Sequence, residues 1–111
     1  MPAHLLIDPQ VMRHSASQAA NLLRALANED RLMLLCELSQ RERSVGELEA
    51  LLDIRQPTLS QQLGVLRQEQ LVDTRREGKR IYYRVASEEV KSLLATLYNL
   101  YCQTAPGSDA S

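Results

Sequence analysis

The sequence predicts a mainly helical domain that carries one small β-hairpin. Leu accounts for 20 of the 111 residues, whereas Phe and Trp are absent. A leucine-rich core without large aromatic side chains favours helices over a sandwich or barrel. Apolar residues recur at helical intervals over most of the chain. The exception is residues 72–85, where apolar and polar residues alternate around Gly78 and Lys79, as in two strands joined by a two-residue turn.

The first two helices are expected between Pro9 and residue 43. From Pro9 to Ala27 the apolar positions follow helical spacing, and many of them are small enough to permit close packing. Asn28 is a favourable N-cap for a second helix, and the acidic residues after it suit the positive end of the helix dipole. The second helix is expected to end in the polar stretch 39–43.

A third, short helix and a fourth helix follow. Ser44 and Glu47 have the spacing of a capping box, which predicts a helix that ends near Leu52. Residues 53–55 then form a tight turn. Pro57 fits the first position of the fourth helix, because that position needs no backbone N–H.

The hairpin and a last helix complete the domain. The strands are expected at 72–77 and 80–85, with Gly78 at the first central position of a II′ turn. The inward face of the second strand is predicted to carry Ile81, Tyr83 and Val85. Ser87 caps the last helix. Two short helices joined by a tight turn and followed by a hairpin make a winged helix-turn-helix, in the order ααααββα, over residues 1–104. Residues 105–111 are predicted to be a disordered tail.

The fourth helix carries the side chains expected to read a duplex. Leu59, Leu63 and Leu66 form its core stripe. The opposite face carries short hydroxyls and amides, where a merely solvated helix would carry Glu and Lys, and such groups donate and accept at base edges and phosphates. This face consists of Pro57, Thr58, Ser60, Gln61, Gly64, Val65 and Gln68. Gly64 lies in the middle of this helix, where glycine costs about 1 kcal/mol relative to alanine. Either it lets the wall of a DNA groove approach the helix backbone closely, or it is a neutral surface residue. The candidate contacts are Gln56, Thr58, Ser60, Gln61, Gln62, Gly64 and Arg67, with Gln62 a weaker base-reading candidate than Gln61.

The charge distribution points to the same region. The whole chain has a net charge of −1, but residues 55–86 carry seven Lys and Arg against three Asp and Glu, a net charge of +4. A charge run is usually a solvated face, yet this one directly follows a helix-turn-helix. The hairpin residues expected to straddle phosphates are Arg75, Arg76, Lys79 and Arg80.

The terminal helices are expected to form a dimer interface. The last helix is apolar over more than half of its circumference, which is more than one small domain needs to bury. A symmetric dimer would set two recognition helices about 34 Å apart, which matches successive major grooves of an inverted repeat.

Several motifs of this chain resemble, in the same order, the ArsR/SmtB family of bacterial repressors. They are Leu26–Leu32, Ser44–Leu48, Leu59–Leu63, Leu71-Val72 and Gly78–Tyr83, and the resemblance covers about residues 16–102. It implies a homodimer that blocks a promoter until an inducer binds. Many members sense metals through Cys on the third helix or Asp and His on the last helix, but here 44–52 lacks Cys and 87–103 lacks His. His4 and His14 lack a spaced partner, so a surface role is expected for both.

The two cysteines have no spacing typical of zinc or of a Cys-x-x-Cys redox motif, and on spacing alone they are small buried hydrophobes. The resemblance favours a different interpretation. Cys36 in the second helix and Cys102 in the last resemble the thiol-sensing branch of the family, which responds to persulfides and oxidants and has haemolysin regulators as a related subgroup. This implies reactive sulfur species as inducer and a covalent link that releases the operator.

Other functions are less favoured by the sequence. A soft metal or arsenite as inducer is the nearest alternative, but two thiolates are fewer than such ions prefer. A winged helix used for protein contact is the alternative of another class. No nucleophile–base pair, phosphate loop or metal-ligand spacing indicates an enzyme or a cofactor. With neither a signal peptide nor an apolar run long enough for a membrane span, we expect a cytoplasmic protein.

Overall fold

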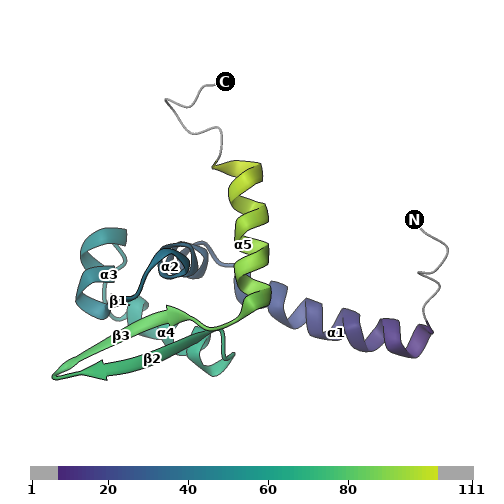
Figure 1. Ribbon diagram of the computed structural model, residues 1–111, viewed down its shortest axis with the longest axis horizontal. Helices are drawn as coiled ribbons and strands as arrows, with labels where there is room; N and C mark the ends of the chain where they lie inside the picture. Colours follow the sequence, from purple (N-terminus) through teal and green to yellow (C-terminus); the bar gives the residue numbers. More distant parts are fainter. Residues whose placement is uncertain (1–7, 103–111) are drawn as a thin grey trace.

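A computed structural model describes residues 8–102 and contains, within that range, five helices and a three-stranded antiparallel sheet (Figure 1). The elements are α1 (Pro9–Leu26), α2 (Glu29–Gln40), β1 (Arg43–Ser44), α3 (Val45–Leu52), α4 (Thr58–Gln68), β2 (Val72–Glu77), β3 (Arg80–Val85) and α5 (Glu88–Tyr101). This order confirms the predicted winged helix-turn-helix. The tail predicted at 105–111 and His4 lie outside the described residues.

The predicted caps begin the helices. The Asn28 side chain accepts a hydrogen bond from the Arg31 N–H at 3.0 Å, and Ser87 Oγ accepts one from the Val90 N–H at 3.2 Å. Each cap satisfies a backbone donor that has no partner inside its helix. Because these signals act within three residues, the sequence was sufficient to find them.

The segment between α2 and α3 contains a strand that the sequence analysis missed. Ser44 and Glu47 form the predicted capping box, with distances of 3.2 and 2.9 Å. Ser44 also belongs to β1, which pairs antiparallel with β3 so that Arg43 lies opposite Tyr83. Two polar residues have no strand periodicity of their own, and only the distant partner strand makes them a strand.

The turn between α3 and α4 occupies residues 53–57, and Asp53 adopts a left-handed conformation with φ of 55°. Pro57 is the N-cap of α4, whereas the sequence predicted it as the first helical residue. The helix therefore begins one residue later than expected, at Thr58. Pro suits this flanking position as well, because the N-cap residue donates no hydrogen bond inside the helix.

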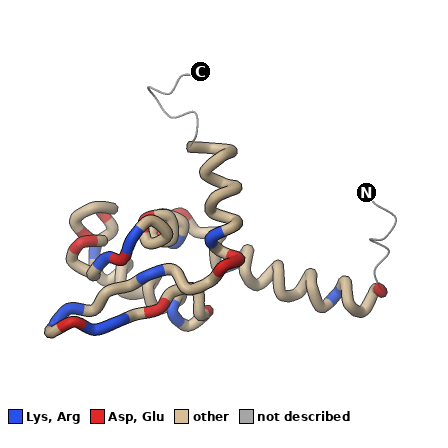
Figure 2. Tube along the Cα trace, in the orientation of Figure 1, with Lys and Arg blue, Asp and Glu red and all other residues tan. Residues whose placement is uncertain are grey.

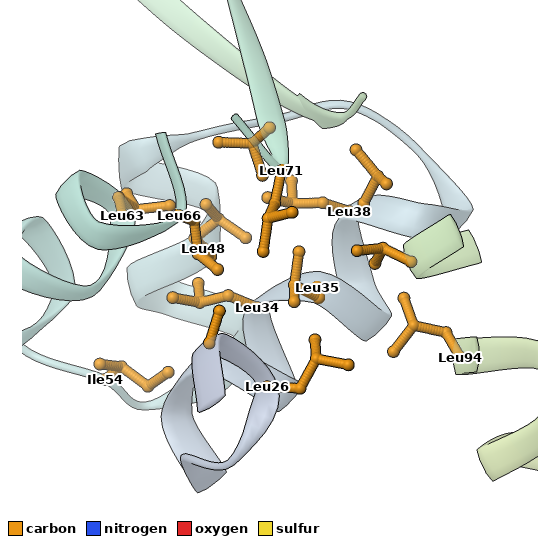
Figure 3. Packing of buried hydrophobic residues seen from close by; sticks show 14 of the residues in the cluster. Leu26, Leu34, Leu35, Leu38, Leu48, Ile54, Leu63, Leu66, Leu71 and Leu94 are labelled. Atoms are coloured by element: carbon orange, nitrogen blue, oxygen red, sulfur yellow. The ribbon is translucent and has the colours of Figure 1, made fainter. Parts of the chain in front are cut away.

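The core lies where α2, α3, α4 and the base of the hairpin meet (Figure 3). Leu34 and Leu35 of α2 are fully buried at its centre. The predicted core stripe of α4 is confirmed, since Leu59, Leu63 and Leu66 are at most 2% exposed. The burial of these three side chains fixes the rotation of α4 about its axis and so determines which of its residues face outward.

The hairpin, which we call the wing (Val72–Val85), has the predicted strands. Gly78 has φ of 64°, the positive value that the first central position of a II′ turn requires. One prediction is wrong. Tyr83 packs against the core and Val85 is buried, but Ile81 is 38% exposed. All three side chains lie on the same face of β3, as predicted. The strands extend beyond the helices (Figure 1), so the helices cover only the base of that face.

Helices α1 and α5 project away from the rest of the domain (Figure 1). Of α1 only Ala25 and Leu26 are buried, and of α5 only Val90 and Leu94. The outer parts of both helices leave large apolar side chains exposed, namely Val11, Met12, Leu23, Tyr98, Leu100 and Tyr101. Among the described residues, no helix is long and apolar enough to cross a bilayer.

Candidate nucleic-acid interface and cysteine pair

Helix α4 presents a polar surface opposite its core stripe. Its outward face, as we use the term, consists of Thr58, Ser60, Gln61, Gly64 and Arg67, which are exposed except for the half-buried Thr58. A Cβ added to Gly64 would meet no described atom within 4 Å. Packing within the described chain therefore does not require glycine there. The residue instead leaves the helix backbone open to close approach from outside.

The start of α4 is held by the residue before Pro57. The Gln56 side-chain oxygen accepts hydrogen bonds from the Ser60 N–H at 3.1 Å and from Ser60 Oγ at 2.7 Å. This contact caps the first turn, which has no capping side chain at Pro57. The Gln56 amide donors take no part in it. Gln56 therefore combines a structural role with an exposed position at the start of α4.

Gln62 is placed differently from its neighbour Gln61. Gln61 is exposed, whereas Gln62 is half-buried, and its side-chain oxygen accepts a hydrogen bond from Arg31 Nη1 at 2.8 Å. Arg31 was not among the residues selected from the sequence. Its partner lies 31 positions away, and no local pattern connects two residues at that distance.

The four wing cations selected from the sequence fall into two groups, and Arg84, the fifth cation of the wing, is paired with Asp73 at 3.8 Å. Arg75 donates to the Glu42 carboxylate at 2.8 and 3.0 Å and to Glu77 at 2.9 Å, and its guanidinium lies 4.8 Å from the centre of the Tyr82 ring. The hydrogen bonds to Glu77 and Glu42 raise the pKa of Arg75, so it stays charged but paired. Its side chain connects the wing to Glu42, in the segment between α2 and β1.

The second group consists of Arg76, Lys79 and Arg80, which we call the tip cations. All three are exposed, and within residues 8–102 none of them takes part in an ion pair. They lie in and beside the turn that joins β2 to β3. Figure 2 shows Lys and Arg positions near this end of the wing, which extends beyond the body of the domain. Arg67 on α4 is likewise exposed. Unpaired cations on a projecting hairpin are available to phosphates without first breaking an internal contact.

Cys36 and Cys102 are both free thiols at the surface. Neither packs as a small buried hydrophobe, which was the expectation from spacing alone. Cys36 lies on α2 beside a hollow of about 490 Å³ between α2 and α5, lined also by Gln40, Lys91 and Tyr98. Cys102 is the C-cap of α5, and its N–H donates to the Tyr98 carbonyl at 2.8 Å.

The two thiols influence each other electrostatically. Partial burial raises the pKa of the Cys36 thiol, and the charge of Cys102 raises this pKa further. Such an interaction between side chains 66 positions apart requires that the fold bring the second half of α2 and the C-terminal end of α5 toward each other. Because the thiolate is the nucleophile, the raised pKa lowers the fraction of reactive Cys36 at neutral pH.

Replacing Cys102 with serine should lower the pKa of Cys36, since it removes the charge contribution and leaves the burial contribution. The thiolate fraction at a fixed pH near 8 then rises, and iodoacetamide should alkylate Cys36 faster. Peptide mapping of alkylation from about pH 7 to 10 measures this. The Cys36 profile should move to lower pH in Cys102→Ser and stay in place in Ser92→Ala, a control on the same helix. An unmoved profile would contradict the interaction between the thiols.

Within residues 8–102 no group of three or more His, Cys, Asp and Glu side chains is arranged to hold a metal ion. His14 is exposed on α1.

A helix-turn-helix whose second helix turns polar groups outward beside a cationic wing defines a DNA-binding transcription regulator. The model of the family described as bacterial regulatory protein, arsR family, matches residues 28–74. The biofilm growth-associated repressor of Agrobacterium fabrum is 58% identical over 91 residues, which are 82% of this chain and 78% of that protein. The chain therefore belongs to the arsR family of bacterial regulatory proteins, whose members regulate transcription and are not enzymes.

Solved structures agree with this assignment. Reduced HlyU from Vibrio cholerae has a TM-score of 0.81 and 46% identity, covering 85% of this chain and 99% of that one. The transcriptional repressor BigR from Xylella fastidiosa has a TM-score of 0.80 and 46% identity, covering 88% of this chain and 97% of that one.

Proposed function

We propose that this chain is a cytoplasmic homodimeric repressor whose DNA binding is switched by a link between Cys36 and Cys102. In the reduced state, the outward face of α4 enters the major groove of an inverted-repeat operator, and the tip cations contact the flanking phosphates. The similarity to the repressor of Agrobacterium fabrum supports repression as the output. The observation that carries the switch is the placement of the two exposed thiols, since Cys36 lies beside the hollow between α2 and α5 and Cys102 is the C-cap of α5.

The sulfur chemistry balances with a low-molecular-weight persulfide, RSSH, as the oxidant. One cysteine thiolate attacks the outer sulfur of RSSH, an S–S bond forms to the protein, and RSH leaves. The second cysteine thiolate then attacks the inner, cysteine-bound sulfur of the protein persulfide, and HS⁻ leaves and takes up a proton to give H₂S, which closes a disulfide. The two cysteines are oxidised and the donor sulfur is reduced. If further donor sulfurs are transferred before closure, the link becomes a tri- or tetrasulfide, which spans a longer gap than a disulfide.

The link would act on DNA binding through the helices that it joins. Cys36 lies on α2, which packs in the helix-turn-helix core, whereas Cys102 ends α5. Tying these two points constrains the angle at which α5 leaves the domain. In a dimer built on α5 this angle sets the separation of the two α4 helices. Because the spacing of major grooves is fixed, a small change in that separation weakens binding.

The exposed apolar surface of α1 and α5 supports the dimer. From Ser92 to Cys102, α5 carries no charged residue, and Leu100 and Tyr101 are 65% and 75% exposed. Exposed apolar surface that continues along two projecting helices is typical of a surface covered by a partner. A second copy of the chain covers it symmetrically and places two wings on one side of the assembly.

Leu100→Asp should weaken the dimer about 100-fold or more, because the change removes apolar burial and adds a charge in both copies of a symmetric interface. Sedimentation velocity over a range of concentrations measures the dissociation constant. Leu51→Asp is the matched control, since Leu51 is 51% exposed but lies on α3, away from α5. Equal effects of the two substitutions, or a monomeric parent protein, would overturn the proposed interface.

A gel-shift titration tests the proposed function as a whole. The reduced protein should bind duplex DNA from the region upstream of its own gene, lose that affinity after treatment with glutathione persulfide, and regain it after reduction by dithiothreitol. Peptide mapping should find Cys36 and Cys102 in one linked species. Release by a soft metal alone, with both thiols unmodified, would refute the sulfur switch and favour a metal inducer. The absence of any duplex binding would favour a protein partner.

A further inference from the structure

Arg31 connects three elements of the domain through one side chain. It lies in the first turns of α2, where its backbone N–H is held by the Asn28 cap. Its Nε donates to the Ala25 carbonyl at 2.6 Å, and its Nη2 donates to the Arg24 carbonyl at 3.2 Å. Its Nη1 donates to the Gln62 side chain in α4 at 2.8 Å. The guanidinium thus joins the end of α1 to the recognition helix.

The residue type suits this task. The last carbonyls of a helix have no partner inside it and carry the negative end of the helix dipole, so a cation is favoured beside the end of α1. A guanidinium is planar and always charged, and its donors have fixed directions, so three contacts fix its orientation. The side chain is half-buried, and hydrogen bonds from a charged donor are stronger than neutral ones. Gln62 is consequently held in one position relative to Ala25.

We infer that Arg31 and Gln62 act together as positioning residues that set the orientation of α4 relative to α1 and so determine operator affinity without contacting DNA. This inference rests on the proposed function, since α1 is part of the proposed dimer interface and α4 is the proposed reading helix. It also assigns Gln62 a role distinct from that of Gln61. The Gln62 oxygen is already occupied by Arg31, whereas Gln61 is exposed on the outward face.

The test is a double-mutant cycle on operator binding by the full-length reduced protein. Gln62→Met keeps side-chain length, Arg31→Met keeps an unbranched apolar stem, and each removes the contact. Each should lower affinity about 10-fold, and the double variant should lower it by the same factor and not by the product, because either change alone breaks the connection. The slope of log affinity against log salt should stay unchanged, because no phosphate contact is lost. Base preference, measured on operators with single substituted base pairs, should also stay unchanged.

Two matched controls separate positioning from direct contact. Gln61→Met replaces the same residue type one position earlier and should lower affinity with a changed base preference. Arg24→Met removes a neighbouring cation, whose side chain contacts Asn21 within α1, and should leave affinity within about twofold. Three results would each overturn the inference. They are additive effects of Arg31→Met and Gln62→Met, a changed base preference in Gln62→Met, and a salt slope reduced by about one per lost phosphate contact in Arg31→Met. Unaltered affinity in both single variants would also overturn it.

Amide exchange of the free protein gives a readout that does not need DNA. Residues 58–68 should exchange about 5- to 10-fold faster in Arg31→Met and in Gln62→Met, and at the parent rate in Gln61→Met. If the parent protein binds no operator but exchange accelerates in these two variants, the proposed function fails and the positioning role stands. If exchange is unaltered, the positioning role fails whatever the DNA result.

Discussion

Replacing either Cys36 or Cys102 with serine is expected to leave operator binding by the reduced protein within about twofold and to abolish its release by persulfide. Both residues are exposed, and conservative changes at exposed sites usually alter stability by no more than about 0.5 kcal/mol. The link needs both thiols, so the loss of either removes the whole response. In the parent protein the response is expected to be a fall in affinity of about 5- to 150-fold, which is the usual range of coupling between two sites.

The measurement is fluorescence anisotropy of a labelled operator, with each protein titrated before and after treatment with glutathione persulfide. Cys36→Ser and Cys102→Ser should differ in their products, because each retains one thiol that can be sulfurated without closing a link. Mass spectrometry should therefore find an open persulfide on the remaining cysteine and full operator binding. Retained release in both variants would make the cysteines structural residues, and retained release in one would reduce the switch to a single reactive thiol.

Removing the three tip cations should have the largest effect on affinity. Arg76→Gln, Lys79→Gln and Arg80→Gln together remove six cations from a dimer. If these six cations contact phosphates, a plot of log binding constant against log salt concentration has a slope of about −5 for the parent protein. In the triple variant the magnitude of this slope should decrease toward zero. At 0.15 M salt the expected loss of affinity is on the order of 1,000-fold. The fold should persist, since all three side chains are exposed and form no ion pair in the described residues.

Two further substitutions control for charge. Arg75→Gln should reduce the slope much less, because Glu42 and Glu77 already neutralise Arg75. Arg13→Gln removes a cation from α1, which projects away from the wing (Figure 2), and should leave the slope unchanged. A triple variant that keeps the parent slope would show that the wing does not contact phosphates. A slope that falls equally in Arg13→Gln would indicate a diffuse charge effect.

The parts of the fold that local chemistry determines were predictable from the sequence. Asn28, Ser44 and Ser87 begin helices because each side chain bonds a backbone N–H three residues later. The wing was predictable from its alternation and from Gly78. By contrast, β1 exists only through pairing with β3, and the exposure of Ile81 depends on how far the wing extends past the helices.

The candidate site likewise has features that follow from local sequence and features that depend on contacts between distant residues. The polar face of α4 follows from helical geometry once the core stripe is known, so most of its residues could be named in advance. Two contacts could not be predicted from the sequence, namely that of Arg75 with Glu42, 33 positions away, and that of Gln62 with Arg31. Only the folded chain brings these groups together. Likewise, residue spacing alone gave no reason to pair Cys36 with Cys102. The pairing came from a family resemblance, and the structure adds that both thiols are exposed, one on α2 beside the hollow next to α5 and one at the C-cap of α5.

Hydrogen exchange with and without an operator duplex tests the binding surface most directly. Peptides that cover residues 56–68 and 75–80 should exchange more slowly in the complex, whereas peptides from residues 9–20 of α1 should be unaffected by DNA in the preformed dimer. Slower exchange in both the α4 and wing peptides is the predicted result. Unchanged exchange there under saturating DNA, or protection confined to α1 and α5, would contradict the account.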